Sequence, residues 1–176
     1  MVYVRQALPM DAQAMSRIFA LSWKSAYRGI VPDAYLDALR EDFWTSAFSG
    51  WFEGGDMKGQ MIYEGSRAVG AVVYGPGRDA RWSDWGEVVA IYVHPHYQGR
   101  GFGTKLLEVA VEDLRSMGYA RAYLWVLEEN LDGRLFYEAN GWDRAEESCV
   151  IQIMNQPLVE RRYTIGAREG ALGQII

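Results

Sequence analysis

The sequence has one cysteine, Cys149, and two histidines among its 176 residues. A single cysteine excludes an internal disulfide, and so few cysteines and histidines argue against a structural zinc site. No apolar run approaches the roughly 20 residues that span a bilayer, and the N-terminus lacks the apolar core of a signal peptide. The net charge of −5 argues against non-specific nucleic-acid binding, which needs a basic surface. We therefore expect a cytoplasmic protein without a metal site and with neither nucleic acid nor a membrane as a partner.

Composition and chain length indicate one globular domain. Hydrophobic residues make up 49% and charged residues 23% of the chain, which is typical of a folded protein with a substantial core. No composition shift or flexible linker divides the chain. We predict a single domain over residues 1–165, followed by a C-terminal extension, residues 166–176, to which the sequence assigns no role.

Hydrophobic periodicity predicts alternating strands and helices. Helical spacing starts at Pro9 and again at Pro32, and further helices are expected over residues 42–52, 101–117 and 131–140. Strands are expected over residues 2–6, 60–63, 68–74, 85–93, 121–127, 149–154 and 160–165. This order requires a mixed sheet flanked by helices, which is an α+β domain of three layers.

The most informative segment is the glycine-rich turn Gln98-Gly99-Arg100-Gly101-Phe102-Gly103-Thr104, which joins a strand to a helix. Glycine permits unusual backbone dihedrals and close approach of a ligand, and the amides at a helix N-terminus attract an anion. The turn therefore suits a pyrophosphate group. Its G-x-G-x-G spacing matches neither a Walker A loop nor the G-x-G-x-x-G dinucleotide motif. A purely structural turn is the alternative.

Two motifs together resemble the GNAT superfamily of N-acetyltransferases. Residues 98–103 match its Q/R-x-x-G-x-G/A signature, and residues 130–142, Asn-Leu-Asp-Gly-Arg-Leu-Phe-Tyr-Glu-Ala-Asn-Gly-Trp, are similar to its second conserved segment. Residues 23–33 are also similar to a bacterial subgroup that includes polyamine acetyltransferase-like proteins. The resemblance implies a GNAT-like domain that uses acetyl-CoA as donor, and similar folds commonly form homodimers.

The resemblance also implies which residues contact acetyl-CoA. The turn amides would hold the pyrophosphate, and the strand end and Asn130 would orient the pantetheine arm; Asn130 is equally explained as a helix N-cap. The full set of expected donor contacts is Tyr92, Val93, Gln98, Gly99, Arg100, Gly101, Phe102, Gly103, Thr104, Asn130 and Tyr137.

Direct transfer to an amine requires a proton donor for the leaving thiolate and a base for the amine. The resemblance places Tyr137 near the sulfur, where its phenol would protonate the thiolate; aromatic packing is the alternative. Glu87 is the predicted base, because strict alternation puts it on the same strand face as Val93. Asp84 is the second choice, and a solvated charge at the strand start is the alternative interpretation of Glu87. Cys149 is interpreted as a packing residue.

The first two helices cover the acceptor site in this family, so Trp23, Tyr27 and Tyr35 are expected to line it. Acidic residues between positions 33 and 42 could attract a cationic amine or form a solvated helix face. The predicted function is transfer of acetyl to a primary amine of a small molecule, polyamine or protein. A non-catalytic acyl-CoA-binding module on the same fold is the alternative, and glycine spacing disfavours a nucleotide-binding protein.

Overall fold

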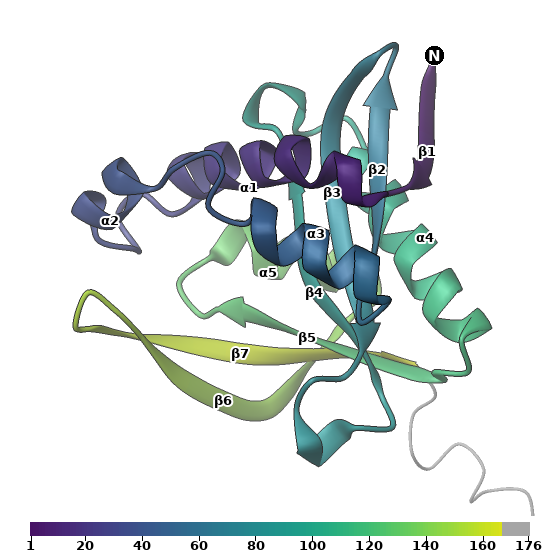
Figure 1. Cartoon of the computed structure of the whole chain (residues 1–176). Helices are drawn as coiled ribbons and strands as arrows, with labels where there is room; N and C mark the ends of the chain where they lie inside the picture. Colours follow the sequence, from purple (N-terminus) through teal and green to yellow (C-terminus); the bar gives the residue numbers. More distant parts are fainter. Residues whose placement is uncertain (167–176) are drawn as a thin grey trace, which may run out of the picture.

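The computed structural model describes residues 1–166 (Figure 1). Residues 167–176, nearly all of the predicted C-terminal extension, lie outside the described residues. The strands are β1 Val2–Gln6, β2 Lys58–Glu64, β3 Arg67–Pro76, β4 Gly86–Val93, β5 Arg121–Leu127, β6 Asp143–Ile153 and β7 Gln156–Gly166. The α-helices are α1 Ala12–Ala26, α2 Asp33–Ala38, α3 Thr45–Gly54, α4 Phe102–Ser116 and α5 Leu131–Ala139. No helix in this part of the chain is long and apolar enough to cross a membrane.

The strands form one seven-stranded mixed sheet in the order β1-β2-β3-β4-β5-β7-β6. All neighbouring pairs are antiparallel except β4 and β5, which are parallel. Helices α1 and α3 pack on one face of the sheet, and α4 packs on the other. The prediction of a mixed sheet between helical layers is thus confirmed.

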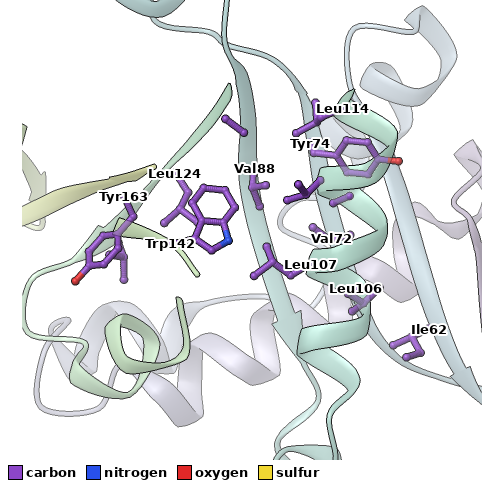
Figure 2. Close-up of a cluster of buried hydrophobic side chains, with 14 of the residues drawn as sticks. Ile62, Val72, Tyr74, Val88, Leu106, Leu107, Leu114, Leu124, Trp142 and Tyr163 are labelled. Carbon is purple, nitrogen blue, oxygen red and sulfur yellow. The ribbon is translucent and has the colours of Figure 1, made fainter. Parts of the chain in front are cut away.

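The larger core lies between α4 and the sheet (Figure 2). Leu106, Leu107 and Leu114, which lie on one face of α4, are buried against Val72 and Val88. Helix α4 ends at Ser116, and Gly118 shortly after it has a φ of 100°, the left-handed conformation typical of the residue that follows a helix. The sequence pattern predicted both the buried stripe and the stop.

The final hairpin is longer than its sequence predicts. Strand β6 begins at Asp143 rather than near Cys149, and β7 begins at Gln156 rather than Glu160. The additional β6 residues, Asp143-Arg144-Ala145-Glu146-Glu147, are mostly polar because β6 is an edge strand with one side open to solvent. Such a segment lacks the apolar alternation by which strands are recognised in a sequence.

Candidate active site

The site is built around a gap between the two parallel strands at the centre of the sheet. Strands β4 and β5 pair only at Gly86↔Ala122 and Glu87↔Tyr123. Beyond these pairs the two strands diverge, and β5, β7 and β6 turn away from β1–β4 (Figure 1). A cavity of about 950 Å³ occupies the gap, and residues of the glycine turn, α1, α3, α5, β4, β5 and the β6–β7 hairpin line it.

One end of the cavity is the glycine turn at the start of α4. Gly99 and Gly101 have φ of 73° and 80°, and Gly101 is the helix N-cap. A Cβ built on either glycine has no neighbour within 4 Å, so the backbone conformation, rather than packing in the protein, calls for glycine at both positions. Phe102, Gly103 and Thr104 follow in the first helical turn, where backbone amides have no partner within the helix. The turn therefore directs unpaired donors at the cavity that these residues line.

The side chains of Gln98 and Arg100, both in the turn, have different surroundings. The Gln98 side chain donates a hydrogen bond to the carbonyl of Val93 at 3.1 Å and lines the cavity. The Arg100 guanidinium instead forms an ion pair with Glu64 of β2 and lies 4.9 Å from the centre of the Phe102 ring. Arg100 is not among the residues that line the cavity, so a contact between Arg100 and the donor stays a prediction.

Tyrosines occupy the middle of the cavity. Tyr137 comes from α5, and Tyr92 comes from the end of β4. The Tyr92 hydroxyl is 2.8 Å from the hydroxyl of Tyr27, the C-cap residue of α1, whereas the Tyr137 hydroxyl has no hydrogen-bond partner within residues 1–166. Burial raises the pKa of Tyr137 and, to about 12, that of Tyr27. Tyr137 is thus a neutral phenol with a proton free for donation.

Asn130 precedes α5 and has the N-cap role foreseen for it. Its side-chain oxygen accepts a hydrogen bond from the amide of Gly133 at 3.1 Å. Both residues also line the cavity. The carboxamide nitrogen of Asn130 therefore remains available to a bound molecule while the oxygen caps the helix.

The other end of the cavity has aromatic walls. Trp23 and Tyr27, two of the predicted acceptor residues, line it, but Tyr35 does not. The centre of the Tyr35 ring lies 6.3 Å from the centre of the Trp23 ring. The complete aromatic lining at this end is Phe19, Trp23, Tyr27, Trp44, Phe48, Trp51 and Trp125.

The acidic residues between positions 33 and 42 do not belong to the cavity lining. Asp33 and Asp37 both pair with Arg28, and Asp42 pairs with Arg40. These carboxylates are exposed and paired with arginines, which fits the alternative of a solvated helix face.

Glu87, the predicted base, is buried and already bound. Its side chain is 4% exposed, and its carboxylate accepts hydrogen bonds from Arg78 Nη2 at 2.8 Å, Arg78 Nε at 3.0 Å and the Tyr123 hydroxyl at 3.1 Å. Glu87 is absent from the cavity lining, whereas Arg78 is present. Asp84, the second choice, is an exposed residue that pairs with Arg121 at 3.2 Å.

The prediction that Glu87 and Val93 share a strand face is wrong. Strand β3 pairs Val73 with Ala90 and Tyr74 with Val88, so one residue of β4 is skipped. This β-bulge interrupts the alternation. Val88 and Val93 consequently face α4 together, and Glu87, next to Val88, faces the opposite side.

The family model for the acetyltransferase (GNAT) family matches residues 16–142. This chain belongs to the GNAT acetyltransferase family. The uncharacterized N-acetyltransferase YuaI of Bacillus subtilis is 32% identical over 152 residues, which cover 84% of this chain and 83% of YuaI. The prediction of an N-acetyltransferase is confirmed at the level of the family.

Solved structures reproduce the fold of this GNAT protein. The PaiA N-acetyltransferase from Thermoplasma acidophilum, in complex with coenzyme A, superposes with a TM-score of 0.72 at 19% identity over 92% of this chain and 98% of that chain. YncA, a putative acetyltransferase from Salmonella typhimurium with acetyl-CoA, gives a TM-score of 0.72 at 18% identity over 97% of this chain and 96% of that chain.

One acidic residue of the site, Glu160 of β7, escaped the sequence-based prediction. It lines the aromatic end of the cavity, and Cys149 of β6 donates its thiol hydrogen to Glu160 Oε2 across 3.6 Å. Cys149 is half-buried and outside the hydrophobic clusters, so its interpretation as a core packing residue is wrong. Period-2 alternation places Glu160 on the face of the buried Leu158, but only the fold reveals that this face borders the cavity.

Proposed function

We propose that this GNAT protein binds acetyl-CoA along the cavity and transfers the acetyl group directly to a primary amine. The observation that supports this most is the continuity of one cavity from the glycine turn, through the β4–β5 gap, to the aromatic end. A donor with a pyrophosphate, an extended arm and a terminal thioester requires a site of this length. The aromatic end of the cavity then remains for the amine.

Donor binding is assigned to the start of α4 and to the edge of β4. The amides from Gly99 to Thr104 and the positive end of the α4 dipole favour the pyrophosphate. Strand β4 pairs with β3 along its length but with β5 at only two positions, which leaves its second edge free for the pantetheine amides. Tyr92, Val93 and the Asn130 carboxamide border that edge.

Tyr137 is the proposed acid. It reaches the cavity from α5, its pKa is raised by burial, and its hydroxyl is without another partner among the described residues. A phenol that stays protonated in this setting can give its proton to the thiolate as the C–S bond breaks. A β4 amide beside the bulge would stabilise the oxyanion that forms first.

The experiment is release of free CoA thiol from acetyl-CoA in the presence of mixed primary amines. We expect CoA release to be faster with amine than the hydrolysis of acetyl-CoA without amine, and we expect mass spectrometry to detect the N-acetylated amine. Acetyl-CoA binding without turnover across a broad amine panel would instead support the non-catalytic acyl-CoA-binding module. Absence of binding would refute both.

A further inference from the structure

The aromatic end of the cavity contains very little charge. Within residues 1–166, two carboxylates line the cavity, namely Asp132 in the exposed first turn of α5 and Glu160 on β7. Arg78 is the lining cation at this end, and its charge is already matched by Glu87. Glu160 is thus the one acidic group that the aromatic end offers to a ligand.

Glu160 sits in the middle of the sheet face that borders the acceptor side. Its cross-strand neighbours are Leu127 of β5 and Cys149 of β6. Its only hydrogen-bond partner among the described residues is the Cys149 thiol, and it forms no ion pair with them. A half-buried carboxylate that forms no ion pair gains stability when a ligand supplies the opposite charge.

The surroundings of Glu160 also make it a better proton acceptor than an ordinary carboxylate. Burial raises its pKa, and the nearby charge of Glu87 raises it further, while the Cys149 thiol and Arg78 act in the opposite direction. Tyr27, the C-cap residue of α1, lies near Glu160 as a neutral phenol, because burial raises the Tyr27 pKa to about 12. A carboxylate with a raised pKa in a cleft is a typical general base.

We propose that Glu160 binds the ammonium group of the acceptor and removes its proton, and that the acceptor is a primary amine on an aromatic or other apolar body. This inference rests on the proposed acetyl transfer. One carboxylate matches one ammonium group, and the tryptophan and tyrosine faces around it favour an apolar body with a single cation. A polyamine would leave its further ammonium groups against apolar rings and near Arg78, without a carboxylate to balance them.

The ammonium transfers one proton to the Glu160 carboxylate, and the freed nitrogen lone pair attacks the thioester carbonyl carbon. The C–N bond forms while the carbonyl electron pair moves to oxygen. Collapse of that oxyanion breaks the C–S bond, and the sulfur leaves with the electron pair and takes the Tyr137 proton. The second proton of the nitrogen restores Tyr137, and Glu160 returns its own to solvent.

The test compares two amines and a set of isosteric variants. Acetyl-CoA affinity is first measured by calorimetry, and kcat/KM is then measured for 2-phenylethylamine and for 1,4-diaminobutane. We expect acetylation of 2-phenylethylamine to be at least about tenfold more efficient, which corresponds to roughly one well-placed apolar group. Glu160→Gln should lower kcat/KM by about 10²–10⁴-fold, the usual loss for a general base, with unchanged acetyl-CoA affinity.

The pH profile separates a base from a merely structural residue. The wild-type kcat/KM should fall as Glu160 becomes protonated, at a pH above the ordinary carboxyl pKa of about 4.3. The Glu160→Gln defect should shrink as pH rises towards the amine pKa of about 10, because free amine then forms without help. Glu160→Asp keeps the carboxylate and should recover part of the activity. Glu146→Gln, an exposed carboxylate on the same hairpin, is the matched control and should behave as wild type.

The outcomes are distinguishable. Failure to bind acetyl-CoA refutes the proposed function itself, whereas binding with a preference for 1,4-diaminobutane refutes the acceptor class. A Glu160→Gln enzyme with wild-type turnover, or a pH-rescued defect in Glu87→Gln instead, refutes the assignment of the base. Should Glu160→Gln not fold, the wild type still provides a test. Neutral 2-phenylethanol should inhibit with an affinity at least about tenfold below that of 2-phenylethylamine, and equal affinities would exclude an ammonium site.

Discussion

Replacing Gly101 by aspartate tests the glycine turn as the pyrophosphate site. Gly101 is the N-cap of α4 with φ of 80°, and a Cβ atom built there has no protein atom within 4 Å. Asparagine and aspartate tolerate this left-handed conformation better than other side chains. Gly101→Asn is therefore the matched control, because it has the same shape and backbone strain as Gly101→Asp but no charge.

The magnitude follows from the repulsion between the new carboxylate and a pyrophosphate held by the amides of the turn. Two unit charges about 4 Å apart repel by about 1 kcal/mol in water and about 4 kcal/mol near a protein surface. Because about 1.4 kcal/mol is a factor of ten, Gly101→Asp should bind acetyl-CoA roughly 5- to 1,000-fold more weakly than Gly101→Asn. The difference should shrink with added salt, since this surface is open to solvent.

Thermal unfolding with and without acetyl-CoA provides the assay. A ligand at 100 times its Kd stabilises the native state by about 2.7 kcal/mol, which for a chain of this size raises Tm by about 5–11 °C. The wild type should show this shift, Gly101→Asn a smaller one and Gly101→Asp little or none. Equal affinities in the Asp and Asn variants, measured by calorimetry, would show that the pyrophosphate binds elsewhere.

Three further predictions concern single side chains. Tyr137→Phe should lower turnover by about 10²–10⁴-fold, without rescue at high pH and with unchanged acetyl-CoA affinity. The control Tyr3→Phe, at an exposed residue of β1, should have no effect. Near wild-type turnover in Tyr137→Phe would contradict the acid role. Asp11→Asn should lower the free energy of unfolding by about 1–3 kcal/mol at pH 7, because Arg5 bonds the carboxylate at 2.8 and 2.9 Å and lowers its pKa. Because folding lowers the pKa of Asp11, its stabilising contribution is present above the ordinary carboxyl pKa and is lost as the pH falls through the lowered pKa. The difference in stability between wild type and Asp11→Asn should therefore vanish in acid. Urea unfolding at pH 7 and pH 2 checks this. Glu87→Gln should cost about 1–3 kcal/mol in urea unfolding, because it weakens the hydrogen bonds from Arg78, and an unchanged midpoint would contradict that structural role.

The sequence by itself determined the elements whose signals are local. The leucine stripe of α4 and the left-handed glycine that ends the helix repeat at spacings set by backbone geometry, so no knowledge of the fold was needed to find them. The same holds for the glycine turn, because its dihedrals and its free amides come from residues 99–104 alone. The hydrogen bond by which Asn130 caps α5 is also local, because its partner Gly133 is only three residues away.

The tertiary structure decided what depends on contacts between distant segments. Glu87 looked available in the sequence, but Arg78 and Tyr123 hold its carboxylate, and a bulge opposite β3 turns it to the other face from Val93. Arg100 seemed placed for a phosphate, yet Glu64 on β2 draws its side chain away.

Glu160 shows the same dependence for the acceptor side. Its surroundings come from β5, β6 and the loop that holds Arg78, all distant from it in sequence. Period-2 alternation assigns Glu160 to a face of β7, but the divergence of β5 from β4 makes part of that face a cavity wall. A carboxylate's charge state and partners are set by everything within several ångströms of it, and these neighbours are brought together only by the folded sheet.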